Sequence, residues 1–442
     1  MVRPLQPLDE EIADRKQALH LLFEGRTQGE WWFETVMVWI PALVEVGLGI
    51  AAFAPFAVHR YSVGKWRKQT LEYPVNDSKL PSVTIMLPVW NESLIIEQKL
   101  GNLAKQNLDC SLLVIDSAST DSTVEKINSW LKKNPKAFDS THVLEMSERL
   151  GKTEAVRQAI AHLEKESFDG CICMTDADAF LPPNALSRLQ GWFADRTIGA
   201  VGARALRHQS LSSEKTHRSM FEFLREGESA KDSTPFLEGS CMMWRSSCFQ
   251  SIQLNTLSNA DDAQIATGVR LNGFRSIHDS EVYFEDVAPM SPEGQRRQKI
   301  RRGQGLQRLL MSHRKSWFDR RLGTFSSILR REAHFHILAP LLVMGAGLSG
   351  IIRWIIVMIA GMPSGSLALM HSSLALIELM CLTAWALDRR GIRIPLLQTV
   401  GSIFTGMEHL VSAHWQTLRG RSLHMWEQHS DTRKKIADSD LN

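Results

Sequence analysis

The chain has 442 residues, which favours two or three structural units and leaves ample length for a hydrophobic core. Its formal net charge is only +3, so the overall charge does not indicate nucleic acid as a partner. The 6 cysteines form no CxxC pair, and we expect reduced thiols in a reducing compartment and no zinc site. Apolar residues make up 44% of the chain; their long runs lie near its two ends, whereas the middle is typical of an α/β domain.

Three apolar segments predict transmembrane helices, since a spanning helix needs about 20 apolar residues. These segments are residues 36–58, 337–361 and 366–387. The first lies too far into the chain, behind an acidic stretch, to be a cleaved signal peptide. We therefore expect an integral protein of the cell membrane, with an N-terminal segment over residues 1–35.

Charged residues inside the later two segments, Arg353 and Glu378, are costly in a membrane unless they pair or face protein. Arg353 could also extend its side chain to the outer interface, and the sequence does not separate these two arrangements. Positive charges concentrate on the cytoplasmic side of membranes, so we expect residues 69–332 in the cytoplasm and the N-terminus outside. The basic residues that follow the first segment are His59, Arg60, Lys65, Arg67 and Lys68.

The stretch after Pro395 has apolar residues at helical spacing and polar residues on the opposite face. This pattern favours a helix over residues 394–412 that lies in the membrane surface. A helix packed on the protein body is the alternative, and whether the segment crosses the membrane is left open. The tail, residues 413–442, then stays on the cytoplasmic side.

The central region alternates short apolar strands with helical patterns, which predicts an α/β fold with a mostly parallel sheet. In such sheets, ligands bind beyond the carboxyl ends of the strands. Pro88, Asp116 and Asp176 all fall at those ends, so we expect them at one edge of the sheet. The strands predicted here cover residues 83–88, 112–115 and 171–174.

Side chains near these strand ends suit a nucleotide. Asp116 can accept a hydrogen bond from a base N–H group, and Lys152, which opens a helix after Gly151, suits a phosphate. Asp176 and Asp178 are one residue apart in an extended segment, so both can address a hard divalent cation that bridges diphosphate oxygens. Taken alone, Asp-Ala-Asp after a strand is more often an ordinary strand-to-loop junction.

Four motifs in chain order resemble the nucleotide-binding half of the family 2 glycosyltransferases, and the resemblance covers roughly residues 80–310. The motifs are Pro88-Val-Trp-Asn91-Glu92, Asp116-Ser-Ala-Ser-Thr-Asp121, Gly151-Lys152-Thr-Glu-Ala155 and Asp176-Ala-Asp178. The resemblance implies the Rossmann-like GT-A fold, inversion at the anomeric carbon, Mg²⁺ or Mn²⁺, and a nucleotide-diphosphate sugar donor, with a UDP-sugar favoured. It assigns the metal to Asp178 and Asp176. It assigns the nucleotide sugar to Pro88, Asn91, Glu92, Asp116, Lys152, Asp176 and Gln298.

The acceptor half of the family is matched as well. The segment Phe236–Arg245 resembles the family's small-residue acceptor segment, in which Gly239 and Ser240 let a sugar approach the backbone. Ala260-Asp261-Asp262 stands where the family has Thr-Glu-Asp, so the resemblance assigns the general base to Asp262. A carboxylate beside another acid and near a diphosphate should have a raised pKa, which suits proton removal from an acceptor hydroxyl. The alternative is that both acids only cap the following helix.

Gln298-Lys-Ile-Arg301-Arg302 resembles the family's Gln-x-x-Arg-Trp stretch, which implies that Arg301 holds the leaving diphosphate as a second catalytic residue. Arg302 stands where Trp is usual in synthases of long polymers, and this weakens the polymer-synthase interpretation. Residues 420–433 resemble the C-terminal Trp-and-Arg segment of some membrane members, which can close over the donor. A disordered basic tail is the alternative.

These features together predict a membrane-bound, inverting, metal-dependent hexosyltransferase that moves a sugar to a lipid-linked or saccharide acceptor at the cytoplasmic membrane face. A processive polysaccharide synthase is the alternative, and a non-catalytic nucleotide-binding membrane protein is a third hypothesis. RNA or DNA binding through residues 296–302 has little support, because no aromatic residues are interleaved there. The sugar, the linkage, the base and the oligomeric state are left open.

Overall fold

The computed structural model describes residues 28–74, 79–206, 212–286, 291–392, 394–423, 425 and 430–438. Most of the predicted N-terminal segment, residues 1–35, therefore lies outside the described residues, as does Trp426 of the tail. The chain divides into two compact units. The first unit combines Met1–Ala51 with Leu341–Leu382, and the second combines Ala52–Pro340 with Thr383–Asn442.

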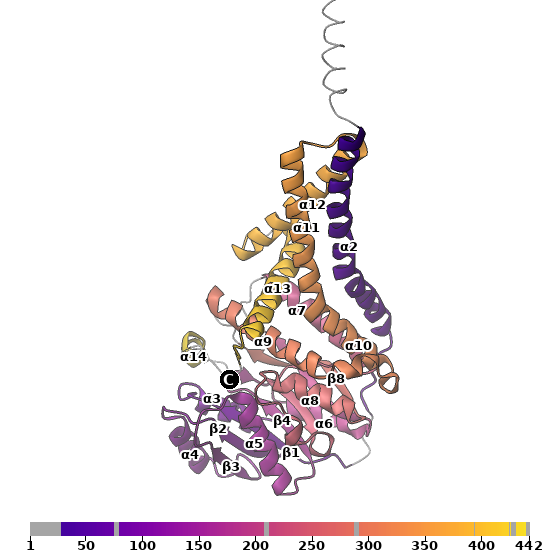
Figure 1. The fold of residues 1–442 in the computed structure, drawn as a ribbon. Coiled ribbons are helices and arrows are strands. Elements are labelled where there is room, and N and C mark those ends of the chain that lie inside the picture. The colour runs from indigo at the N-terminus through magenta and orange to yellow at the C-terminus, as the bar shows by residue number, and fades with distance from the viewer. Residues whose placement is uncertain are drawn as a thin grey trace, which may run out of the picture. The chain divides into compact units, whose positions relative to one another are not determined.

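The second unit is built on an 8-stranded sheet with strand order β3-β2-β1-β4-β7-β6-β8-β5 (Figure 1). Strands β3, β2, β1 and β4 run parallel to one another, as do β6 and β8. Strand β7 is antiparallel to both of its neighbours, and β5 is antiparallel to β8. The strands are β1 (Val83–Val89), β2 (Ser111–Asp116), β3 (Thr141–Glu145), β4 (Cys171–Thr175), β5 (Ala179–Phe180), β6 (Ile198–Leu206), β7 (Cys241–Arg245) and β8 (Arg275–Asp286).

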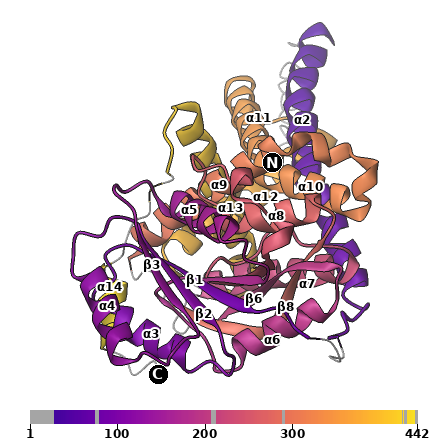
Figure 2. The ribbon, with the colours of Figure 1, turned by 90° about the horizontal axis from the view of Figure 1, so that it is seen from below.

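Helices cover both faces of this sheet, which is why its central strands are apolar on both sides. Neighbouring residues of β1 belong to different cores: Ile85 packs with α3, α4 and α6, and Met86 packs with α5 and α8. Figure 2 shows α5 and α8 on one face and α3, α4 and α6 on the other. The helices of this region are α3 (Ile96–Ala104), α4 (Thr123–Lys133), α5 (Lys152–Lys165), α6 (Ala185–Gly191), α7 (Ser212–Lys231) and α8 (Asp261–Leu271).

The register of the parallel strands brings the predicted strand ends together. Val89 pairs with Asp116, and Met86 pairs with Met174 two residues before Asp176. Pro88 is buried inside β1, opposite Ile115. The carboxyl ends of β1, β2 and β4 therefore form one edge of the sheet, where a ligand of an α/β fold is expected.

Within the described residues, three helices are long and apolar enough to cross a membrane: Met37–Trp66, Thr324–Ala360 and Gly365–Arg389. The basic residues expected after the first span are part of its helix, because Lys and Arg are good helix formers. The helices are α2 (Gln28–Trp66), α10 (Thr324–Ala333), a π-helical turn (His334–Leu338), α11 (Ala339–Ala360) and α12 (Gly365–Arg389).

In the first unit, the charged residue inside α11 is paired. The side chain of Arg353 is fully buried, and its Nε donates to Glu45 over 3.0 Å. Its second terminal nitrogen lies 3.0 Å from Glu378, and its first bonds His371 over 2.6 Å. Of the two arrangements left open by the sequence, the structure has pairing, which is how proteins lower the cost of such a charge.

The amphipathic helix α13 (Pro395–Leu418) packs against α9 (Pro292–Ser312) in the second unit. Gln307 donates to the carbonyl of Leu410 over 3.0 Å, and Gln304 donates to Thr417 over 3.1 Å. These bonds bury polar groups of α9 against α13, so a helix on the protein body, the alternative left by the sequence, is present. A position of this helix at the membrane surface stays a prediction.

Candidate active site

The Asp-Ala-Asp loop connects β4 to β5 at the carboxyl edge of the sheet. One oxygen of Asp176 lies 2.5 Å from the ammonium of Lys152, and the other accepts a hydrogen bond from Ser240 over 2.9 Å. Burial alone would raise the pKa of Asp176, but the positive charge of Lys152 and these bonds lower it. Asp176 is therefore ionised at neutral pH.

Lys99, on α3, is a fully buried lysine that fastens this loop from behind. It donates to Thr175, just before the loop, over 2.8 Å, and to the carbonyl of Ala179, just after it. Burial lowers the pKa of Lys99 to about 8, so the side chain is still mostly protonated at pH 7. Both ends of the loop are thus held by a single ammonium group.

Lys152 is the first residue of α5, after Gly151, whose φ of 92° favours glycine. Its ammonium lies 3.7 Å from Asp261 in addition to its bond with Asp176. Burial works to lower the pKa of Lys152, but the two carboxylates raise it on balance. A fixed cation at a helix N-terminus is suited to a phosphate group.

The loops after β1 and β2 are fastened to each other. The Asp116 carboxylate is buried and accepts hydrogen bonds from the N–H of Ser119 over 2.8 Å and from its hydroxyl over 2.5 Å. Asn91, with φ of 54°, accepts from the N–H of Thr120 over 2.7 Å. Asp116 and Asn91 therefore fix the conformation of the two loops at which the sequence predicts binding of the nucleotide base.

An arginine from the end of the chain reaches the same edge. Arg433, on α14 (Ser430–Ala437), lies 2.7 Å from Asp178 and 2.6 Å from Glu92, which is fully buried. The pairing supplies a positive charge to a carboxylate that the sequence assigns to a metal ion. Residues 420–433 resemble a segment that can close over the donor, but Arg433 was not among the predicted site residues.

The acceptor segment enters β7 from this edge, because β7 runs antiparallel to β4. The N–H of Gly239 donates to Asp262 over 3.1 Å, and the next residue, Ser240, donates to Asp176. A Cβ at Gly239 would lie 3.2 Å from the Cβ of Asp262, tighter than usual. Two consecutive residues therefore hold these carboxylates, Gly239 by its backbone N–H and Ser240 by its hydroxyl. The absence of a side chain at Gly239 allows the close approach of Asp262.

Asp262 lies in the first turn of α8, but the N-cap residue of this helix is Ala260. Its carboxylate accepts from the N–H of Ala263 over 2.7 Å as well as from Gly239, which is outside the helix. Burial, and then the charge of Asp261, raise the pKa of Asp262 to about 6. Two carboxylates at one edge thus differ in protonation behaviour, a pattern found where acid and base roles are divided.

Helix α9 packs against the segment that leads to Asp262, the predicted general base. The carbonyl of Arg301 accepts from Asn259 over 2.7 Å, and a Cβ at Gly305 would lie 2.1 Å from the Asn259 carbonyl. Glycine at this position lets α9 lie against the segment leading to Asp262. The guanidinium of Arg301 donates to the carbonyl of Met425 over 3.3 Å, and Gln298 is partly buried one turn earlier on α9.

Comparison with protein-family models gives two matches. The model described as "Glycosyl transferase family 2" matches residues 84–252, and "Glycosyl transferase family group 2" matches residues 171–387. The two matches together run from the first strand of the sheet to the last membrane-span helix. The chain belongs to the family 2 glycosyltransferases.

A curated relative of this glycosyltransferase is the poly-β-1,6-N-acetyl-D-glucosamine synthase of Staphylococcus aureus (strain COL), 24% identical over 260 residues. That match covers 57% of the chain, and the chain spans 60% of the relative's length. Among solved structures, the mannosyltransferase PcManGT from Pyrobaculum calidifontis, in complex with GDP-Man and Mn²⁺, superposes with a TM-score of 0.68 at 24% identity. The superposition covers 86% of this chain and 100% of the mannosyltransferase chain, and it shows that the catalytic unit has the GT-A fold.

Proposed function

We propose that this glycosyltransferase is a membrane-bound, metal-dependent hexosyltransferase that inverts the anomeric carbon of a nucleotide-diphosphate sugar. The observation that carries the proposal is the placement of Asp176, Asp178 and Asp262 at one edge of the sheet. Ser240 and Gly239 bind two of these carboxylates from consecutive positions. Membership of the family supports a nucleotide sugar as the donor.

The donor side fits Mg²⁺ or Mn²⁺, because Asp178 and Asp176 offer the hard oxygen ligands that these ions prefer. The position beside Asp178 accommodates a positive charge, since Arg433 lies there. A bound divalent ion would offset the charge of the diphosphate. Lys152 binds the same diphosphate, and Arg301 stabilises it as it leaves, by charge-assisted hydrogen bonds.

The base-binding loops favour a UDP-sugar. Asp116, fixed by Ser119, accepts an N–H of the base, while Asn91 holds the neighbouring loop through Thr120. The P. calidifontis mannosyltransferase was solved with GDP-Man, so guanine is the base to compare with uracil. A screen with UDP-sugars and GDP-sugars as donors distinguishes the two bases.

On the acceptor side, Asp262 removes the proton from the attacking hydroxyl. A pKa of about 6 leaves this carboxylate ionised at pH 7 yet more basic than an ordinary aspartate. The acceptor oxygen forms its bond to the anomeric carbon as the bond to the diphosphate breaks. Attack from the face opposite the diphosphate inverts the configuration, and Gly239 and Ser240 let the acceptor come close.

The surroundings of the acceptor segment favour an acceptor with a negative charge, such as a lipid-linked phosphate. Glu238, next to Gly239, lies 2.8 Å from Arg225 and 3.9 Å from Arg302. Arg302 is about half exposed and lies no closer than 3.9 Å to Glu238, so its guanidinium can also bind a phosphate. Arg302 also replaces the tryptophan platform expected in a synthase of long polymers.

A processive polysaccharide synthase is the second candidate, and the similarity to the S. aureus poly-β-1,6-N-acetyl-D-glucosamine synthase favours it. In that case the acceptor is the growing saccharide itself. We place the catalytic unit on the cytoplasmic side of the membrane and the N-terminus outside, on the basis of the positive residues at the end of α2.

A donor screen tests the function. Membranes containing the protein are given Mn²⁺ or Mg²⁺ and a panel of radiolabelled nucleotide sugars, and labelled lipid is separated from labelled polymer. We expect transfer from one UDP-sugar to a lipid-extractable product, and no transfer by Asp262→Asn. Polymer made in a single encounter supports the synthase instead. Metal-dependent nucleotide binding without transfer from any donor would leave a nucleotide-binding membrane protein.

A further inference from the structure

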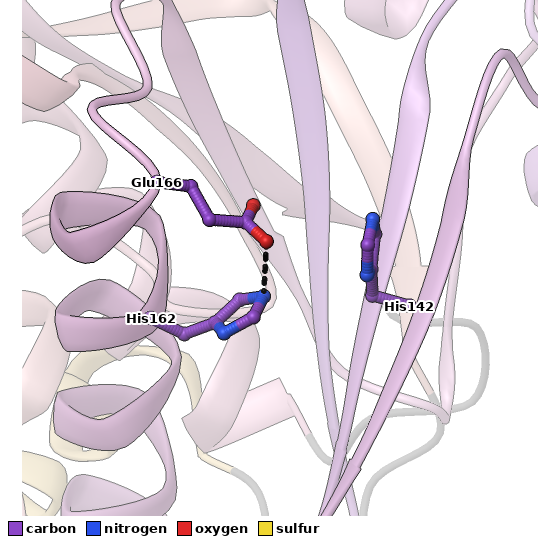
Figure 3. A group of neighbouring side chains, drawn as sticks. All are labelled: His142, His162 and Glu166. Carbon is purple, nitrogen blue, oxygen red and sulfur yellow. Dashed lines mark ion pairs between the residues drawn. The ribbon is translucent and has the colours of Figure 1, made fainter.

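Two histidines and a glutamate come together in the second unit, at a place that the proposed reaction does not use. His142 lies on β3, His162 lies in the last turn of α5, and Glu166 is the C-cap residue of that helix. Figure 3 shows the three side chains projecting toward one another from the strand and the helix. One ligand atom from each side chain lies within 4.8 Å of the others.

The fold itself brings these residues together. Strand β3 is the last strand of the sheet beside β2, and α5 leads back to the start of β4, so its C-terminal end lies beside the starts of the strands. Leu144 packs on the core that contains α5. Side chains alternate along a strand, so His142, two residues earlier, faces α5 as well. The His142 and His162 rings have centroids 5.7 Å apart.

The cluster combines ligand atoms with a local charge that favours a cation. The buried Nε2 atom of His162 lies 3.2 Å from a carboxylate oxygen of Glu166, so two potential ligand atoms already face one point. A metal ion bound between them would take the place of the proton that a histidine–glutamate ion pair requires. The C-terminal end of α5 adds a partial negative charge, which favours a cation at this position.

We propose that His142, His162 and Glu166 bind a borderline transition-metal ion, Zn²⁺ foremost. Two imidazole nitrogens and one carboxylate oxygen are typical zinc ligands, whereas Mg²⁺ and Mn²⁺ prefer sites made of oxygen. Tetrahedral zinc needs ligand atoms about 3.4 Å apart, so the exposed His142 must move inward by roughly 1 Å. Water completes the coordination.

Such an ion ties the edge strand β3 to α5, the helix whose first residue, Lys152, is placed on the diphosphate. The site is independent of the Asp176 and Asp178 carboxylates. The expectation of no zinc site was drawn from the cysteines, none of which takes part here. His142 and His162 lie on separate elements and form no local motif, so the site could not be found from the sequence pattern.

Metal titration of the full-length protein in detergent tests the proposal. The protein is stripped with a chelator and titrated with Zn²⁺ against a chromophoric competitor, in excess Mg²⁺ to occupy the oxygen sites. We expect one tightly bound Zn²⁺, and His142→Ala and Glu166→Gln should each weaken it about tenfold or more. Zn²⁺ should also raise the melting temperature of the wild type and leave that of His142→Ala unchanged.

Asp178→Asn and His313→Ala serve as controls, because neither touches the cluster, and both should bind Zn²⁺ as the wild type does. His142 is exposed, so its variant is expected to fold, and Glu166→Gln provides a second, isosteric variant. Equal Zn²⁺ affinity in the wild type and His142→Ala would overturn the proposal. So would loss of binding in Asp178→Asn alone, or no binding to the wild type at micromolar Zn²⁺.

Discussion

Asp176 and Asp262 lie at the same edge of the sheet, yet their surroundings move their pKa values in opposite directions. Asp176 faces the ammonium of Lys152, which holds its pKa down, whereas Asp262 is buried beside Asp261 and has a pKa of about 6. The difference teaches that the donor side is built to hold charge and the acceptor side to exchange a proton.

Asp262→Asn should give the largest effect. Removing a general base costs about 100- to 10,000-fold in turnover. Metal-dependent nucleotide binding should be unchanged, because the donor carboxylates are intact. Turnover is measured with labelled donor, and binding by calorimetry with Mn²⁺ and the nucleotide. Asp178→Asn is the matched variant and should lose the binding itself.

The same Asp262→Asn variant also distinguishes a catalytic role of the Asp262 carboxylate from a role in capping helix α8. An acid whose folded-state pKa is raised loses stability as the pH rises through that pKa, so Asp262 destabilises the fold at pH 7. Asparagine should therefore raise the melting temperature at pH 7. A clear decrease would mean that the carboxylate chiefly supports α8.

Lys152→Met removes the countercharge of the donor side. We expect kcat/KM to fall about 100- to 1,000-fold, because a fixed cation no longer stabilises the departing diphosphate. Lys132→Met, on an exposed part of α4, is the control and should leave kcat/KM unchanged. A Lys152→Met enzyme with normal kinetics would remove this residue from the donor site.

The pH profile should report the acceptor side alone. Asp262 acts in its ionised form, so kcat/KM should rise about tenfold per pH unit up to pH ~6 and level off above. Asp176 stays ionised across this range because its pKa is lowered. A profile without a break between pH 5 and 8 would argue against Asp262 as the base.

Lys99→Met should weaken the hold on the metal loop. It leaves the carbonyl of Ala179 and the hydroxyl of Thr175 without their buried donor, at a cost of about 1–3 kcal/mol. We expect a lower free energy of unfolding and a higher Mn²⁺ requirement for transfer. Lys105→Met, an exposed lysine just after α3, controls for the loss of charge. An unchanged Mn²⁺ requirement would mean that Lys99 contributes to the stability of the fold but not to metal binding.

Gly239→Ala should give the smallest effect. The new Cβ would press on Asp262 at 3.2–3.3 Å and displace the base by a few tenths of an ångström. We expect a cost of about 1 kcal/mol, roughly fivefold in kcat. Nucleotide binding, measured in parallel, should not change. A larger loss of binding than of turnover would place the strain on the donor side.

Strands β1, β2 and β4 were predictable because they are short, apolar and bounded by turn residues, and because parallel strands end at one edge; the other five strands of the sheet were not predicted. The placement of Asp116 and Asp176 followed from that edge, and Lys152 was predicted from its position at the start of a helix. Lys99 was missed, although a lone lysine among Ile95, Ile96, Leu100 and Leu103 on one helix face is a signal for a buried cation.

Individual long-range pairs were not predicted, although the resemblance of residues 420–433 to a segment that can close over the donor pointed to this edge. Arg433 meets Asp178 across 255 positions of chain, and only the fold brings the two together. Whether Arg353 forms ion pairs or extends its side chain to the membrane interface depended in the same way on its distant partners Glu45 and Glu378. Local patterns place a residue on an element, but the packing of elements decides which charges meet.

A structure of the protein with Mn²⁺ and an inert UDP-sugar analogue tests the central claim most directly. We expect Mn²⁺ on Asp178 and Asp176, the diphosphate on Lys152, and the Asp262 carboxylate facing the anomeric carbon on the side away from the diphosphate. A metal bound elsewhere, or a residue 262 turned away from the bound sugar, would contradict it.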